Sequence, residues 1–452
     1  MHRILNIAGK ENNDIDFVMH PPADCIFITS VKADLNLLAE FIDKDIGILK
    51  NNIRAIHISL LNNQSQIDYY INKTITKAKI VIVRLFGDKG TWSYGLEQLK
   101  IWSDKSKENK LLILSGTKEQ EISLNELSNI DFKISQKLSI LLRAGGNENY
   151  FKFLTCISYI LKNNLNIPKN ILEKKIYPDP ILYDWKNTNS INIGIISYKS
   201  LYLANEIELS IELNKQLRKN GFNPKTVFVS TLKDINIQNK LVKLFKKENI
   251  KLLITTTSFD SFIKKINNKN SNDNLTFFEE LNIPVLQILS SSRSKKDWSK
   301  STIGINSLDL LMQIIIPEFD GRIITIPCSF KELSTINYNL CCEITKYEYH
   351  SEGIIWLCEL VKNYIKLSKL SNSQKKVCLI ISNYPIKNSR LGNGVGLNTF
   401  NSIINILNWF KEQGYDFGDS NIPESSNELI SLIMNKRTND LESQSNKPLD
   451  YL

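Results

Sequence analysis

The sequence predicts an α/β protein with tandem flavodoxin-like or Rossmann-like domains, each built on a parallel sheet. Short runs rich in Ile and Val alternate with amphipathic helical stretches, a pattern typical of parallel strands covered by helices. The alternation occurs in two blocks separated by a proline-containing stretch. The chain has 452 residues, too many for one hydrophobic core, so we expect several domains with the last one incomplete.

The first α/β domain is expected over residues 1–145. A helix is predicted at Tyr94–Trp102, and its strands are predicted at Cys25–Ser30, Ala55–Leu60, Lys79–Phe86 and Lys110–Ser115. Residues 146–190 are expected to form a helical and proline-containing connector. Proline disfavours helix at the residue before it, and this stretch contains Pro168, Pro178 and Pro180.

The second α/β domain is expected over residues 191–332. One helix is predicted to carry apolar side chains from Leu203 to Leu217, with Gly221 just beyond its basic last turn. Strands are predicted at Ile191–Tyr198, Thr226–Ser230, Leu252–Thr257, Val285–Leu289 and Arg322–Ile326.

A third unit is expected over residues 333–438, followed by a polar tail at 439–452. Its helices are predicted at Gly353–Leu367 and Asn401–Gln413, with a strand at Lys376–Ser382 and then a glycine-rich loop. One strand is too few to close a core, so this domain is predicted to be only partly present.

The composition is that of a soluble globular protein, with 42% hydrophobic and 23% charged residues. No apolar run approaches the roughly 18 residues of a membrane span, and the N-terminus lacks the apolar core of a secretory signal. We therefore expect a cytoplasmic protein. The net charge is +10, but the lysines are spread along the chain and not gathered beside aromatic residues, so no nucleic-acid partner is expected.

The seven cysteines form no C-x-x-C pair, which argues against a disulfide framework or a zinc site. Cys341 and Cys342 together with His350 are an alternative metal-binding group. Adjacent cysteines on a strand point to opposite faces, so buried thiols are the favoured interpretation and no metal site is assigned.

The stretch Val83–Leu99 places a glycine loop between a predicted strand end and a helix. Ligands of open α/β sheets bind in the crevice at the carboxyl ends of the strands, so Arg84, Tyr94 and Glu97 are candidate contacts. The alternative is a capped turn anchored by a buried Trp92.

Two further strand ends carry polar residues. The stretch Val227–Asp234 is interpreted as a helix N-terminus with Ser230 or Thr231 as the cap. The stretch Pro317–Ile323 offers two carboxylates and a guanidinium for acid–base work or for clamping a ligand. A turn held by an internal ion pair is the competing interpretation, and the candidate residues are Glu318, Asp320 and Arg322.

The stretch Asn383–Thr399 is the most informative, because Gly392, Gly394 and Gly396 alternate between a predicted strand and a helix. Such glycines allow the main chain to approach a ligand closely or to adopt positive φ. No Lys-Ser/Thr follows them, so this is not a P-loop, and any ATP dependence must come from a partner. The candidate polar contacts in this stretch are Asn383, Tyr384, Arg390 and Asn393.

These stretches, taken in order with the Pro-Val-Leu-Gln run at 284–287, resemble the N-terminal region of the cobaltochelatase large subunits, the CobN family. That family is related to the porphyrin-binding H subunit of magnesium chelatase. The chain departs from the family pattern at Asn398-Thr399-Phe400, where relatives usually carry Asp-Thr-Pro.

The resemblance implies an ATP-dependent ligase that forms nitrogen–metal bonds by inserting cobalt into hydrogenobyrinic acid a,c-diamide during cobalamin synthesis. It implies a tetrapyrrole-binding role for this chain, with ATP and Mg²⁺ bound by AAA+ subunits of the CobS/CobT type. The chain covers well under half of a family member. We therefore expect the catalytic residues, which are unknown, to lie in a separately encoded C-terminal portion.

Two other interpretations remain open. The chain is either a degenerate remnant with no chelatase role, or a stand-alone α/β module that binds a small molecule. The retained Gly392, Gly394 and Gly396 and the conventional helix ends argue against a remnant.

Overall fold

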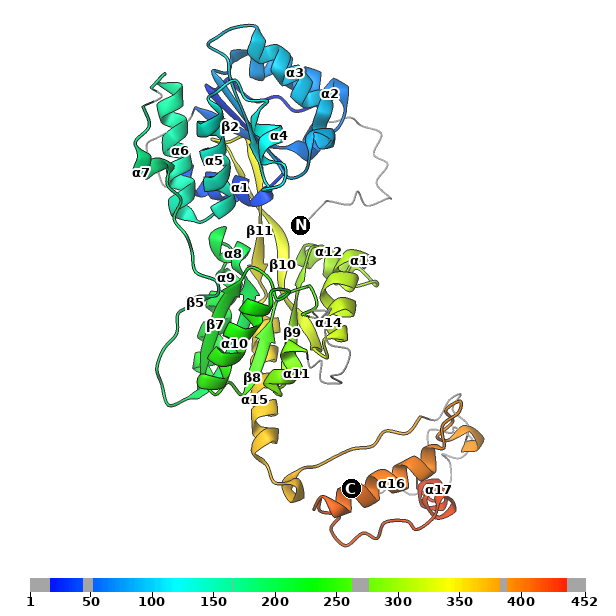
Figure 1. The fold of residues 1–452 in the computed structure, drawn as a ribbon. Coiled ribbons are helices and arrows are strands. Elements are labelled where there is room, and N and C mark those ends of the chain that lie inside the picture. The colour runs from blue at the N-terminus through cyan, green and yellow to red at the C-terminus, as the bar shows by residue number, and fades with distance from the viewer. Residues whose placement is uncertain (1–16, 44–51, 165, 262–275, 383–387, 437–452) are drawn as a thin grey trace, which may run out of the picture. The chain divides into compact units, whose positions relative to one another are not determined.

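A computed structural model describes residues 17–43, 52–164, 166–261, 276–382 and 388–436. Contacts between residues divide the chain into one unit that ends at Glu359 and a second that begins at Leu360. The first unit contains two α/β lobes, which we call the first lobe (17–172) and the second lobe (181–349) (Figure 1).

The first lobe is built on a parallel sheet with strand order β2-β1-β3-β4. Its strands are nearly all buried apolar residues, as expected for a sheet covered by helices on both faces. All of them were predicted from the sequence: β4 has the predicted bounds, and the bounds of the other strands differ by one to three residues. The strands are β1 (Cys25–Thr29), β2 (Ile53–His57), β3 (Ile80–Leu85) and β4 (Lys110–Ser115).

Helices cover both faces of this sheet. One core lies under α2 and α3 and contains Tyr70 and Trp102, and the other lies under α1, α5 and α6 and contains Phe153 and Ile157. Helix α6 therefore packs with the first lobe, although it follows residue 145. The helices are α1 (Lys32–Asp43), α2 (Gln64–Lys73), α3 (Ser93–Asp104), α4 (Glu121–Asn125), α5 (Phe132–Ala144), α6 (Asn147–Leu161) and α7 (Lys169–Leu172).

The second lobe is built on a sheet with strand order β11-β10-β9-β8-β6-β7-β5. Its inner strands run parallel in a flavodoxin-like order, but β5 and β11 pair antiparallel at the two edges, so the sheet is mixed and not purely parallel. The strands are β5 (Ile181–Tyr183), β6 (Ile191–Tyr198), β7 (Phe222–Val229), β8 (Leu252–Thr255), β9 (Val285–Ser291), β10 (Ile323–Asn337) and β11 (Cys342–Tyr349).

The single helix predicted through Leu203–Leu217 is in fact two helices. Asn205 has a left-handed backbone with φ of +58°, which ends the first helix before the second begins. The helices of this lobe are α8 (Lys199–Leu203), α9 (Glu208–Lys219), α10 (Ile235–Lys247), α11 (Phe277–Leu281), α12 (Lys295–Lys300), α13 (Ser307–Leu310) and α14 (Ile316–Phe319).

The β10–β11 hairpin joins the two lobes, because its strands extend from the second lobe into the first (Figure 1). Leu340, Cys342 and Ile344 near its tip are buried in the core of the first lobe. The Ala55 amide of edge strand β2 donates a hydrogen bond of 3.0 Å to the Leu340 carbonyl. We propose that the boundaries predicted at residues 145, 190 and 332 separate units that fold independently.

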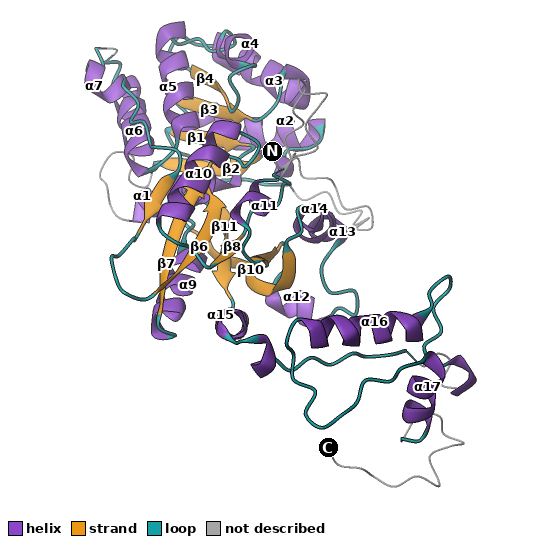
Figure 2. Ribbon diagram, turned by 60° about the horizontal axis from the view of Figure 1, so that its bottom comes forward, coloured by secondary structure: helices purple, strands orange, loops and turns teal. Residues whose placement is uncertain are grey.

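The second unit contains the end of α15 (Ser351–Lys369), then α16 (Thr399–Glu412) and α17 (Ser426–Met434). Ile403, Ile404 and Leu429 form its small core. The strand predicted at 376–382 is wrong: this segment has no strand partner among the described residues and is drawn as a loop (Figure 2). The predicted tail at 439–452 lies outside the described residues.

Candidate functional site

Arg84, at the end of β3, is buried against helix α1. Its guanidinium forms an ion pair with Asp34 and donates a hydrogen bond of 3.2 Å to the Leu142 carbonyl. The Thr29 hydroxyl donates to the other Asp34 oxygen at 2.7 Å. Burial raises the pKa of Asp34, and the charge of Arg84 opposes that shift. Arg84 therefore connects β3 to α1 and does not face a ligand crevice.

The other two candidates from this stretch do not meet Arg84. The Tyr94 hydroxyl donates to the Asp68 carboxylate of α2 at 2.9 Å, while Glu97 is exposed on the surface of α3. Trp92 is buried, and its indole N–H donates to the Leu61 carbonyl at 2.9 Å. This geometry matches the anchored turn and does not match a ligand site.

Asp320 and Arg322 form a buried ion pair with 2.6 Å between Arg322 Nη2 and Asp320 Oδ2. Arg322 Nη1 donates to the Thr257 carbonyl at 2.6 Å and to Gln287 Oε1 at 3.0 Å, and Nη2 donates to the Phe259 carbonyl at 2.6 Å. Every guanidinium N–H group therefore has a partner, and the Arg322 side chain has no exposed surface. Arg322 therefore connects the start of β10 to β9 and to the segment that follows β8.

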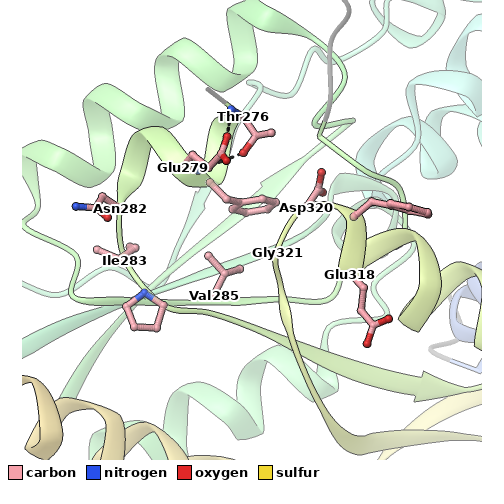
Figure 3. Close-up of a pocket in the computed structure, with 11 residues that line it drawn as sticks. Thr276, Glu279, Asn282, Ile283, Val285, Glu318, Asp320 and Gly321 are labelled. Carbon is pink, nitrogen blue, oxygen red and sulfur yellow. Dashed lines mark hydrogen bonds between the residues drawn. The ribbon is translucent and has the colours of Figure 1, made fainter. Parts of the chain in front are cut away.

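A pocket of about 590 Å³ lies beside this pair, between α11 and the turn that precedes β10 (Figure 3). Glu318 and Asp320 both line it, but their carboxylates point in different directions (Figure 3). Glu279 also lines it and accepts from the Thr276 amide at 2.6 Å in a capping box. With Asp320 and Glu279 engaged, Glu318 is left as the one carboxylate of the lining that makes no hydrogen bond to another described residue.

The stretch 227–234 is a helix N-terminus, as predicted, but its cap is a different residue. Asp234 accepts from the Asn236 amide at 2.8 Å and begins α10, while Thr231 accepts only from the Lys233 amide within the preceding turn. The prediction of Ser230 or Thr231 as the cap is therefore wrong, because Asp234 is an equally good capping residue and directly precedes α10.

The glycine-rich stretch forms a loop that leads into α16. The Gly392 amide donates to the Ser382 carbonyl at 2.8 Å, and the Thr399 hydroxyl donates to the Gly392 carbonyl at 2.5 Å. The Asn398 side chain caps α16 by accepting from the Asn401 amide. The two remaining candidates of this stretch, Asn383 and Tyr384, lie outside the described residues.

The three glycines of this loop are not equivalent. Gly392 and Gly396 have φ of +68° and +75°, a conformation that favours glycine. A Cβ on Gly392 would also lie 2.9 Å from the Phe400 ring. Gly394 has neither restriction, because the nearest atom to its Cβ position would be Leu397 Cβ at 3.5 Å, an ordinary contact. The loop geometry therefore explains two of the glycines and leaves Gly394 unexplained.

A concavity of about 450 Å³ is lined by residues 392–394 and 396–400. Arg390 and Asn393 are exposed next to it, and Val395 and Leu397 expose apolar side chains. This surface offers main-chain groups, an amide, a guanidinium and apolar contacts. It suits contact with a ligand or a partner, and its lining contains no titratable side chain for acid–base catalysis.

Sequence reasoning offered the ion pair of Asp320 with Arg322 but missed the distant partners of the two buried arginines, among them Asp34 and Gln287. Each lies at a strand or helix that is distant along the chain, so no local pattern identifies it. The cysteine–histidine group is also dispersed, since Cys342 is in the core and His350 Nδ1 lies 3.3 Å from the Pro327 carbonyl. Across the described ranges, no group of three or more His, Cys, Asp or Glu side chains is placed to hold a metal ion.

Comparisons with known proteins give a consistent relationship. Residues 140–450 match the family model described as CobN/Magnesium Chelatase. The aerobic cobaltochelatase subunit CobN of Pseudomonas aeruginosa is 26% identical over 99% of this chain, and that of a Sinorhizobium species is 25% identical over 97%. The chloroplastic magnesium-chelatase subunit ChlH of Oryza sativa subsp. indica is 23% identical over 38% of the chain.

A solved structure, the catalytic subunit of cobaltochelatase from Mycobacterium tuberculosis, has the same fold. It matches with a TM-score of 0.63 and 21% identity over 92% of this chain. The matches span 36%, 35% and 33% of the Pseudomonas, Sinorhizobium and Mycobacterium chains, so this chain covers about a third of each relative. No helix among the described residues is long and apolar enough to cross a membrane. The family model covers more than half of the sequence, and the chain therefore belongs to the CobN/magnesium chelatase family.

Proposed function

We propose that this chain is the tetrapyrrole-binding, amino-terminal portion of a cobaltochelatase large subunit in cobalamin biosynthesis. The observation that carries the proposal is the extent of the matches. The two CobN relatives align over 99% and 97% of the chain, whereas the rice magnesium-chelatase subunit aligns over only 38%. This difference favours cobalt over magnesium as the inserted metal and hydrogenobyrinic acid a,c-diamide as the acceptor.

The chemistry of the described residues supports a binding role for this portion. The glycine loop presents main-chain groups and the exposed Arg390 and Asn393, and these residues are suited to carboxylate or amide groups on the rim of a macrocycle. In this proposal, a polypeptide that corresponds to the rest of a CobN relative supplies the catalytic residues. AAA+ subunits bind and hydrolyse ATP, because this sequence has no P-loop.

The test is a reconstitution. The purified chain is mixed with a polypeptide that covers the remaining part of CobN, with the AAA+ subunits, and with ATP, Co²⁺ and hydrogenobyrinic acid a,c-diamide. Cobalt insertion is followed by the change in tetrapyrrole absorbance. We expect insertion only when this chain is present, and with Co²⁺ in preference to Mg²⁺. Equal insertion without the chain would refute the proposed role, and a preference for Mg²⁺ would refute the choice of metal.

A further inference from the structure

Another pocket, of about 400 Å³, lies at the carboxyl ends of β6 and β7. Lys199 and Ser200 follow β6, Ser230 follows β7, and Arg143 comes from the end of α5 in the first lobe. The carboxyl ends of parallel strands are where open α/β sheets bind ligands. The volume is within the range of roughly 300–1,000 Å³ that is typical of small-molecule sites.

The lining of this pocket is strongly cationic. Arg143, Lys174, Lys175 and Lys199 all line it, and no Asp or Glu does. Carboxylates outside the lining pair with three of these cations: Glu121 with Arg143, Glu148 with Lys175 at 2.7 Å, and Asp179 with Lys199 at 3.8 Å. Lys174 is exposed and has no ion pair with another described residue. The pocket therefore presents an unbalanced positive charge.

The Lys199 ammonium has hydrogen-bonding capacity to spare. Its side chain is only 15% exposed, and it donates one hydrogen bond, of 3.0 Å, to the Tyr177 carbonyl. An ammonium carries three donors, and the Asp179 oxygen at 3.8 Å is too distant for a hydrogen bond. The remaining donors are free to bind an acceptor placed in the pocket.

Besides these cations and two serines, the lining is apolar. Ile176, Tyr177 and Leu203 contribute apolar surface, and the Ile176 side chain is 77% exposed. Gly146, with φ of +82°, allows the Tyr177 ring to approach, since a Cβ there would lie 2.5 Å from the Tyr177 hydroxyl oxygen. The Gly146 amide donates to the Leu203 carbonyl at 3.0 Å, which fixes the wall formed by α8.

We propose that this pocket binds a small organic anion that carries a carboxylate next to an apolar body. Lys199 donates to the carboxylate, Lys174 adds positive charge at the rim, and Ile176, Tyr177 and Leu203 contact the apolar part. This site is distinct from the glycine loop, and its occupation does not require the chelatase reaction. If the pocket does not bind such an anion, the proposed function is therefore unaffected.

The test measures binding of octanoate to the full chain by isothermal titration calorimetry, with 1-octanol and acetate as probes that lack the charge and the apolar body. We expect saturable binding of octanoate and much weaker binding of both other probes. Lys199→Met should weaken octanoate binding about ten-fold or more, because it removes a charge-assisted hydrogen bond. Lys174→Met removes only an exposed charge and should weaken it about two- to five-fold.

Lys243→Met is the matched control, because Lys243 is exposed on α10 and does not line the pocket. It should bind octanoate like the unmodified chain. Lys174→Met keeps the test decisive if Lys199→Met fails to fold. Absence of octanoate binding, equal binding of acetate, or binding that no lysine substitution in the pocket reduces would overturn the proposal.

Discussion

His57, the last residue of β2, is a buried histidine whose surroundings favour its neutral form. Its Nδ1 accepts from the Ser59 amide at 3.2 Å and lies 2.7 Å from the Ser59 hydroxyl. Burial lowers the pKa of His57 to about 4, and the positive charges of Lys32 and Lys331 act in the same direction. In the unfolded chain the pKa of this residue is close to 6.5.

This difference makes the stability of the fold depend on pH. Between pH 6.5 and about 4 the unfolded chain binds a proton at His57 that the folded chain does not, so stability rises with pH across this window. The contribution of His57 is complete above pH 6.5 and is lost as the pH falls toward 4. His57→Asn keeps an acceptor for the Ser59 amide and removes the titration.

We predict that the free energy of unfolding in urea falls by about 1–3 kcal/mol more for the unmodified chain than for His57→Asn as the pH is lowered across this window. Carboxylates that titrate in both proteins contribute equally to the two curves, so their effect cancels in the comparison. They include Asp34 and Glu206, and burial raises the pKa of both. Parallel stability–pH curves for the two proteins would show that folding does not lower the pKa of His57.

At the same scale, the candidate site residues show what local sequence can predict. The ion pair of Asp320 with Arg322 was available as an interpretation, because the two residues are only two positions apart. The buried Trp92 was also available, but the Leu61 carbonyl that anchors it lies 31 residues away. The role of Arg84 could not be predicted, because its partner Asp34 lies 50 residues away and the fold alone brings the two together. A buried guanidinium and a ligand-binding one have the same local signature.

At the scale of elements, β10 is longer than predicted from the sequence, and β11 was not predicted. Only 322–326 was predicted as a strand, whereas β10 continues to Asn337 and pairs there with β11. Leu340 is fully buried, yet every contact that buries it in the first lobe comes from residues distant along the chain. Such an insertion is visible only once the two lobes are placed together.

The hairpin tip is therefore expected to stabilise the first lobe. Leu340→Ala should lower the free energy of unfolding by about 2–5 kcal/mol, the range for truncating a buried leucine side chain. Ile336→Ala on the same hairpin is the control and should cost much less, because Ile336 is 52% exposed. Denaturant unfolding followed by tryptophan fluorescence, which includes Trp92 and Trp102 of the first lobe, measures both. Equal losses for the two variants would mean that the tip does not contribute to that core.

The segment 376–382 shows the opposite case, in which propensity predicts a strand and context does not provide one. A strand needs a hydrogen-bonded neighbour, and β propensity expresses how well a side chain fits a half-buried sheet surface. Here Val377 is 52% and Ile380 is 93% exposed. The prediction failed because a strand depends on its partner as well as on its own residues.

We expect the amides of 376–381 to exchange with solvent far faster than those of β6, which are buried in the second lobe. Hydrogen exchange followed by mass spectrometry compares the two segments in one experiment. Addition of the polypeptide that corresponds to the rest of CobN should slow exchange at 376–381. Protection of this segment in the isolated chain, equal to that of β6, would contradict the structure.

At the scale of the whole molecule, the tandem α/β architecture followed from the alternation of strands and helices, and the structure confirms it. The antiparallel edges β5 and β11 did not follow, because edge strands are short or half exposed and carry weak periodicity. The packing of α6 against the first lobe was also missed, since Tyr150, Phe153 and Ile157 occupy one face of a helix that lies beyond the expected boundary. The order of several motifs indicated the family, whereas no single motif was sufficient.

We propose that the glycine loop contacts the tetrapyrrole or a partner during cobalt insertion. Gly394 is the residue that tests it, because a side chain there meets no close contact within the loop and its φ is not left-handed. Gly394→Val should therefore leave the fold intact, and Asn405→Ala on the exposed surface of α16 serves as the matched control.

The decisive measurement is the rate of cobalt insertion by the reconstituted complex, followed by tetrapyrrole absorbance, with circular dichroism to verify folding. We predict that Gly394→Val abolishes insertion while Asn405→Ala inserts cobalt at the normal rate and both spectra stay unchanged. Near-normal insertion by Gly394→Val would contradict the claim and leave this loop as a structural turn.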